Sequence, residues 1–396
     1  MFCKNNIKLV VYLLMYVGLF LGNVPLRAEE NKLGKFEFGG FVKVSAAVST
    51  KGLNGIDDAL GLYNADLLFA GDDKGSRFGI SAKESRLHVT YIKNDTVLGP
   101  IKAYVEGNFG VDGNNDANTL EAYGSSNHRF VLRHAYVEIG DFLVGQTFST
   151  FLDPVSAPQV LDYGGNAASV FARQPQIRFT KKMHNFTVRL AAENPTTNLG
   201  PNLITDDQRV PDLVGRVDYD SDFGHVSVAG ILRELRIDNG EHEAHKLTGG
   251  FAVTGSKQVI KDKFDIMMQY IRGGIGHYGS FSAFADGIIL VDNDGNFFID
   301  PLLFHGVTAS ATFYLNNKLS TTLVGSWTKN LNPGQNTQTL GSGHSIETVK
   351  SFHANLYYNL SDDLLIGIEY KKLIGLLSDG TKPNVDRYQA SMVFTF

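Results

Sequence analysis

The chain has 396 residues, of which 43% are hydrophobic and 19% are charged, and its formal net charge at pH 7 is −5. A soluble protein of this length often has two or three domains, but no linker, low-complexity tract or helical heptad divides this sequence. The acidic balance argues against a general nucleic-acid-binding protein. The 42 glycines, 27 phenylalanines and 16 tyrosines favour one large domain built from many alternating strands.

The first residues are typical of a cleaved export signal. Lys4 and Lys8 precede an apolar run over 9–21, and a small-residue site ends at Ala28. We therefore predict a signal peptide at 1–28, a short N-terminal segment at 29–34 and an outer-membrane β-barrel porin domain at 35–396. The only cysteine, Cys3, lies within the predicted signal, so the exported part has no thiol with which to form a disulfide.

Alternation of apolar and polar residues predicts an all-β protein, a transmembrane antiparallel β-barrel of about 16 strands. In the last strand, Tyr388, Met392 and Phe394 share one face, and Gln389 and Ser391 share the other. The predicted strands, each bounded by Gly, Asn, Asp or Pro, are 35–49, 77–94, 99–109, 128–139, 142–148, 172–181, 186–193, 212–219, 224–233, 245–255, 263–272, 305–314, 318–328, 349–358, 363–372 and 386–396.

The connections between these strands alternate between short turns and long polar loops, as a membrane meander requires. The long loops are expected at 50–76, 110–127, 149–171, 194–211, 273–304 and 329–348. The alternative is a soluble β-sandwich, which would also alternate. A sandwich does not require aromatic residues to recur near strand ends, as Tyr104, Tyr136, Phe142, Tyr219 and Phe313 do here, so the pattern favours the membrane barrel.

The third long loop, residues 149–171, is predicted to fold into the barrel, and we call it the constriction loop. It contains two prolines, a predicted hinge at Gly164 and Gly165, and more apolar residues than a solvated loop usually carries. Asp153 and Asp162 are expected either to pair with cations of the wall or to face the passage. The alternative is an external loop that caps a neighbouring subunit. The residues expected to pack the loop against the wall are Phe151, Leu152, Val155, Val160 and Leu161.

Strand alternation places several basic residues opposite the apolar face, where they would line a water-filled channel, because a guanidinium facing lipid is costly. The residues are Lys43, Arg86, Lys102, Arg178, Arg189 and Arg216. Arg133 is also assigned inward, although it shares a face with Val131. A basic wall predicts preference for small anions. Inward carboxylates at Glu106, Glu193, Asp218, Asp265 and Glu369 would reduce this preference. The alternative is that the basic residues are scattered along the channel and are hydrated without binding solutes.

Four segments, SAKESRLHVTY, LGPIKAYVEGNFG, RFVLRHAYVEIGDFLVGQTFSTFLDPVSAPQVLDYGG and RQPQIRFT, resemble DcaP-type porins. The resemblance implies a homotrimeric, sixteen-stranded outer-membrane channel for small anions, including aliphatic and aromatic dicarboxylates. It also points to Arg86, Arg133, Arg173 and Arg178 as motif positions. Members can carry a coiled-coil extension, whereas here only EENKLGK follows Ala28, so we expect the barrel walls to hold the trimer together.

No pattern in the sequence indicates catalysis, a resident metal or a cofactor. HEAH at 242–245 lacks the HExxH zinc spacing, and DNDGN from Asp292 places Phe297 where a calcium loop has glycine. GSGHS near His344 lacks the GxSxG nucleophile turn. We therefore predict a non-enzymatic porin whose partners are small anionic solutes, outer-membrane lipid and lipopolysaccharide, and no nucleic acid. The alternatives are a surface adhesin or structural barrel with incidental conductance, and a barrel-embedded hydrolase.

Overall fold

The computed structural model describes residues 34–51, 75–110, 129–199, 204–205, 208–238, 243–279, 284–292, 296–332 and 346–396. The predicted signal peptide at 1–28 and the adjoining segment at 29–33 lie outside the described residues. So do most of the predicted loops at 50–76, 110–127 and 329–348.

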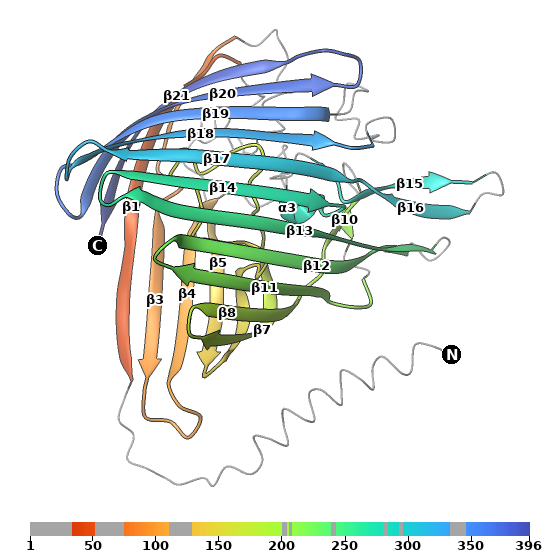
Figure 1. Ribbon diagram of the computed structural model, residues 1–396, viewed down its shortest axis with the longest axis horizontal. Helices are drawn as coiled ribbons and strands as arrows, with labels where there is room; N and C mark the ends of the chain where they lie inside the picture. The colour runs from red at the N-terminus through yellow and green to blue at the C-terminus, as the bar shows by residue number, and fades with distance from the viewer. Residues whose placement is uncertain are drawn as a thin grey trace.

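The described strands form one closed antiparallel barrel (Figure 1). The sheet has seventeen strands, but β2 and β3 both pair with β1, at Ser45–Ser49 and Lys35–Phe41 respectively, so together they fill one of sixteen strand positions. The barrel strands are β1 (Lys35–Ser49), β2 (Arg77–Ser81), β3 (Arg86–Lys93), β4 (Ile101–Gly110), β5 (Arg129–Ile139), β6 (Phe142–Phe148), β7 (Arg173–Met183), β8 (Phe186–Glu193), β11 (Asp212–Ser221), β12 (Gly224–Asp238), β13 (Glu243–Ile260), β14 (Phe264–Gly273), β17 (Phe304–Tyr314), β18 (Leu319–Asn330), β19 (Ile346–Asn359), β20 (Leu364–Leu377) and β21 (Asn384–Thr395).

The predicted sixteen-stranded barrel is therefore confirmed, with one local difference. The strand expected over 77–94 is interrupted between Ser81 and Arg86 by a turn in which the Ser85 amide donates to the carbonyl of Ala82 (3.0 Å). The Ser85 hydroxyl accepts from the Lys43 amide (3.0 Å), so the interruption stays attached to β1.

The last strand closes the barrel against the first. β1 and β21 pair from Phe41 opposite Thr395 to Ser49 opposite Arg387. The backbones of Gly40 and Phe396 exchange two hydrogen bonds at the end of this seam (3.0 and 3.1 Å). In the part of the chain that the structure describes, the sheet thus closes on itself, and closure places backbone hydrogen bonds within the wall, as a bilayer requires.

The two faces of the wall have opposite chemistry. On β21, Tyr388, Met392 and Phe394 are exposed on the outside, whereas Gln389 and Ser391 are buried on the inside. The same alternation continues on β1 and β20. Apolar side chains outside and polar side chains inside are the reverse of a soluble sandwich and suit a wall surrounded by lipid.

The long connections carry additional structure at one rim. A two-stranded pair, β9 (Thr197–Asn198) and β10 (Ile204–Thr205), follows β8. The connection between β14 and β17, expected as a plain loop, contains the single helical turn α3 (Gly276–Gly279) and the hairpin of β15 (Gly287–Val291) and β16 (Phe297–Pro301) (Figure 1). Among the described residues, no helix is long and apolar enough to cross a membrane.

A buried apolar cluster occupies part of the barrel interior. Ile271 of β14, Phe304 of β17, Tyr278 of α3 and Phe151 of the constriction loop all belong to it. The rings of Phe151 and Tyr278 meet at 6.0 Å between centroids. Apolar side chains of the loop and the wall therefore fill part of the lumen.

Candidate functional site

The constriction loop crosses the inside of the barrel, as predicted. It leaves β6 with the Thr150 amide donating to Glu193 at the end of β8 (2.7 Å). Farther along, the amides of Ala167 and Ala168 donate to the hydroxyls of Ser351 on β19 (3.0 Å) and Ser326 on β18 (2.8 Å). Bonds to such distant strands exclude an external position for this loop.

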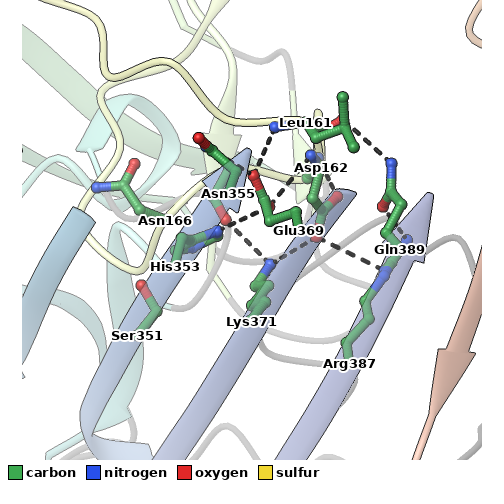
Figure 2. Close-up of polar contacts among 12 residues, drawn as sticks. Leu161, Asp162, Asn166, Ser351, His353, Asn355, Glu369, Lys371, Arg387 and Gln389 are labelled. Atoms are coloured by element: carbon green, nitrogen blue, oxygen red, sulfur yellow. Dashed lines mark hydrogen bonds and ion pairs between the residues drawn. The ribbon is translucent and has the colours of Figure 1, made fainter. Parts of the chain in front are cut away.

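Asp162 fixes the far end of the loop to β20 and β21 (Figure 2). Its carboxylate lies 2.9 Å from the Lys371 ammonium and 3.6 Å from the Arg387 guanidinium, and all three side chains are buried. Burial opposes ionisation of Asp162, but Arg387 and Lys371 outweigh it and hold the pKa of this carboxyl well below its ordinary value. Asp162 therefore remains charged and anchored at neutral pH.

The predicted glycine hinge forms a tight turn beside this anchor. The Gly164 amide donates to the Asp162 carboxylate (2.8 Å), and the Gly165 amide donates to the Asp162 carbonyl (3.0 Å). Gly165 has φ 70°, in the left-handed region that favours glycine, and its carbonyl accepts from Lys371 (3.0 Å). These contacts hold the turn in one position.

A second anchor joins the loop to Glu369 and Lys43. Glu369 accepts from the Leu161 amide (2.6 Å) and contacts the His353 ring (3.1 Å) (Figure 2). Lys43 donates to the Leu161 carbonyl (2.6 Å) and pairs with Glu84 in the turn after β2 (2.7 Å). Lys43 points inward, as alternation predicts, but it is 1% exposed and lies beneath the loop, where a solute does not reach it.

The other loop carboxylate also turns toward the wall. Asp153 contacts the His225 ring of β12 (3.1 Å), accepts from the hydroxyl of Thr254 on β13, and accepts from the Val155 amide (3.1 Å). The sequence left open whether the two loop carboxylates contact the wall or face the passage. Both contact the wall. The exposed side chains of the loop are all uncharged and are Pro154, Val155, Ala157, Gln159 and Tyr163.

On the wall near Tyr163, Arg86 and Arg133 contact the carboxylate of Glu106, and we call these three residues, with the neighbouring Arg173, the Glu106 group. Glu106 lies 2.8 Å from Arg133 and 3.8 Å from Arg86, and it accepts from the Tyr104 hydroxyl (2.7 Å). Arg173 is close enough to Arg133 to repel its charge. The Tyr163 ring of the loop lies 5.2 Å from the Arg86 guanidinium, so the loop meets the arginine wall here.

A bulge resolves the ambiguous position of Arg133. Glu106 is opposite His134, but the next residue, Gly107, is opposite Leu132, so β5 contains one extra residue. Arg133 and His134 consequently both reach the interior, which strict alternation forbids. Arg173 lies over the Phe171 ring (5.3 Å) at the point where the loop enters β7.

Farther along the wall, Arg189 and Arg216 share Asp218, and we call these residues the Asp218 group. Arg216 lies 3.0 Å from Asp218 and also donates to the carbonyls of Thr150 and Leu152 at the base of the loop. Arg189 contacts Asp218 and keeps 23% of its side chain exposed. Arg216 is thus mainly a loop anchor, whereas Arg189 faces the water.

Two further basic residues complete the predicted set. Lys102 pairs with Glu138 (3.2 Å) and remains well exposed. Arg178 is attracted by Glu138 and Glu193 at longer range, but in the described ranges it has no ion pair within 4 Å. Within the described structure, Arg178 is therefore the least neutralised by direct contact among the predicted basic residues.

Asp153, Asp218 and His225 lie close enough together to hold a metal ion. Arg189 and Arg216 both contact Asp218, however, and their positive charge opposes a cation at this point. The residues present do not fit a metal centre.

Sequence reasoning missed that Lys371 and Arg387 hold the loop through Asp162, and that His353 contacts the Glu369 anchor. Ile366, Ile368 and Tyr370 lie on the outer face of β20, so the same alternation would have placed Lys371 inward. Strand alternation does not tell which loop residue lies against Lys371.

The barrel, its apolar outer face and its internal loop define a channel of the bacterial outer membrane. The sequence pattern of the family "DcaP outer membrane protein" matches residues 23–300, well over half of the chain. The chain belongs to this family, which makes it a porin-type channel and not an enzyme.

Comparison with solved structures agrees on the fold. The outer-membrane channel DcaP of Acinetobacter baumannii superposes with TM-score 0.78 at 19% identity, covering 94% of this chain and 100% of that one. A trimer form of OmpT from Vibrio cholerae gives 0.56 at 11% identity, covering 92% and 100%. An anion-selective porin from Comamonas acidovorans gives 0.54 at 11%, also covering 92% and 100%. No curated protein matches the sequence.

Proposed function

We propose that this channel admits small hydrophilic solutes by passive diffusion and prefers anions such as dicarboxylates. The observation that carries the proposal is the unequal use of charge at the constriction. Both carboxylates of the loop are buried against the wall, whereas Arg86, Arg178 and Arg189 retain access to water.

The balance of charges favours anions. The Glu106 group has three arginines for one carboxylate, and the Asp218 group has two for one. Arg178 adds a further positive charge. Because the loop contributes no compensating exposed acid, a solute between the loop and this wall experiences a net positive potential.

The spread of the arginines suits a solute with two carboxylates. Planar guanidinium groups match carboxylates in geometry, and charge-assisted hydrogen bonds are about twice as strong as neutral ones. The two groups lie on different strands, with Arg86 on β3 and Arg189 on β8. A dicarboxylate that moves along the wall can therefore meet guanidinium donors at one group and then at the other.

Planar-bilayer recording in a potassium chloride gradient tests the preference. Wild-type protein should give a reversal potential on the anion side, and succinate should reduce chloride current by competition. Replacing Arg86, Arg178 and Arg189 by Gln should move the reversal potential toward cations. Replacing the turn residues Lys261, Lys263 and Lys318 by Gln removes the same charge elsewhere and is the control.

Two results would oppose the proposal. An unchanged reversal potential in the arginine variant would remove these residues from the selectivity, and an electrically silent wild-type barrel would favour the adhesin or structural alternative.

We further infer that the channel is a homotrimer. The supporting observations are the trimer form of OmpT, which shares the fold, and a recess of ≈ 510 Å³ on the outer wall that Ala46, Ala354 and Ala390 help to line. Small residues allow two barrel walls to approach closely. Native mass spectrometry should find three chains per particle, and a monomer in mild detergent would contradict the inference.

A further inference from the structure

A row of cations runs across the outer face of the barrel, on the opposite side of the wall from the channel. Arg272 of β14 pairs in register with His305 of β17, which in turn pairs with Lys329 of β18. Lys350 of β19 is opposite Trp327, which precedes Lys329 by two residues on β18 and lies on the same face. Residues directly opposite each other on paired strands project on the same side of the sheet, so the exposed Arg272 and Lys329 share the outer face with His305.

These cations lack local neutralisation. Arg272, Lys329 and Lys350 are exposed, and within the described part of the chain none of them forms an ion pair. β17 and β18 contain no Asp or Glu, and β19 contains only Glu347, at its irregular start. The connection at 331–345 has no acidic residue either. The row ends at Lys372, which pairs with Asp386 (3.0 Å).

The height of the row is fixed by the aromatic residues beneath it. Tyr270, Trp327 and Phe352 lie on the same outer face, each two residues farther from the rim than Arg272, Lys329 and Lys350. Aromatic girdles mark the membrane interface. Cations immediately beyond a girdle therefore lie at the level of the lipid headgroups.

The rim that carries the row faces the outer leaflet. Its strands are joined by the long connections, including the one that contains α3 and the β15–β16 hairpin (Figure 1). In bacterial barrels the long loops are extracellular and the short turns periplasmic.

We propose that Arg272, Lys329 and Lys350 form a binding site for the phosphate groups of a glycolipid in the outer leaflet. Lys329 and Lys350 are diagonal neighbours, about 7–8 Å apart between Cα atoms. Arg272 and Lys329 are two strand spacings apart, about 10 Å. Cations at these separations can meet two phosphates of one headgroup, while the acyl chains lie along the exposed apolar residues below, such as Met268 and Leu323.

Native mass spectrometry of the purified full-length channel, titrated with diphosphorylated lipid A, tests this site. The variant with Arg272, Lys329 and Lys350 replaced by Gln should bind about 100-fold more weakly, since each cation near a charged lipid surface contributes about a factor of five. Lipid A stripped of its phosphates should bind wild-type protein as weakly as diphosphorylated lipid A binds the variant. Heat-modifiable migration on gels verifies that the variant is folded.

The matched control replaces Lys261, Lys263 and Lys318, at the short-turn rim, by Gln and should bind like wild type. Binding by the row variant within threefold of wild type would overturn the proposal. If wild-type protein bound phosphate-free lipid A as tightly as diphosphorylated lipid A, the proposal would be overturned as well. Displacement of lipid A by inorganic phosphate would identify a site for a free anion instead. Single variants, each with partial loss, provide the same test if the triple variant fails to fold.

Discussion

Moving one negative charge onto the exposed face of the constriction loop tests the account of selectivity directly. Tyr163 is 40% exposed, and its ring lies 5.2 Å from the Arg86 guanidinium. Tyr163→Glu would place a carboxylate where the structure has none. The variant Tyr163→Gln has the same loss of the ring over Lys43 but adds no charge, so it is the matched control.

The expected size follows from Coulomb's law. A charge about 6 Å from a passing monovalent ion changes the energy of that ion by about 0.7 kcal/mol at the dielectric constant of water. An anion is repelled and a cation attracted, so the ratio of the two permeabilities changes by about 1.4 kcal/mol, or about tenfold.

Reversal potentials in a salt gradient measure this ratio. Tyr163→Glu should lower the anion-to-cation permeability ratio about tenfold relative to Tyr163→Gln, with a smaller difference at high salt because the charges are screened. Equal reversal potentials for the two variants would refute the claim that the uncharged loop face allows the arginine wall to dominate.

Glu106→Gln should increase anion preference, because it removes the only carboxylate of the Glu106 group, and a shift toward cations in the same recordings would contradict this. Asp162→Asn should loosen the loop and give larger, noisier single-channel currents, whereas wild-type noise would show that Asp162 is not an anchor. The depressed pKa of Asp162 means that its stabilisation is complete above the unfolded value of about 3.9 and is lost as pH falls through the lower folded value. Single-channel noise in wild type should therefore stay constant from about pH 8 to pH 4, and noise that rises at about pH 5–6 would show that another group controls the loop.

Strand alternation was sufficient to predict the barrel and the direction of most wall charges. It works because neighbouring side chains of a strand must point to opposite faces. In a wall surrounded by lipid, a charged side chain on the outer face costs free energy, so most charged residues point inward. Arg86, Lys102, Arg178, Arg189 and Arg216 accordingly point inward as expected. Their proposed role in solute binding stays a prediction.

Alternation failed where the period is broken or where another segment lies on the wall. Arg133 shares a face with Val131 under strict alternation, yet it reaches the interior as assigned, because the bulge adds one residue and shifts the pattern of period two by one position. Lys43 has the expected direction, yet the loop covers it. The face of a residue depends on its own strand, whereas its exposure depends on contacts with residues more than a hundred positions away.

The distant anchoring of the loop has a consequence for biogenesis. Leu161 is held by Glu369, which lies 208 residues later in the chain. During export the loop emerges long before the hairpin to which it attaches, so the bore cannot acquire its final width until the C-terminal strands have joined the first one. The aperture therefore takes its final shape late, and a truncated chain that lacks its last hairpin would leave the constriction loop without these anchors.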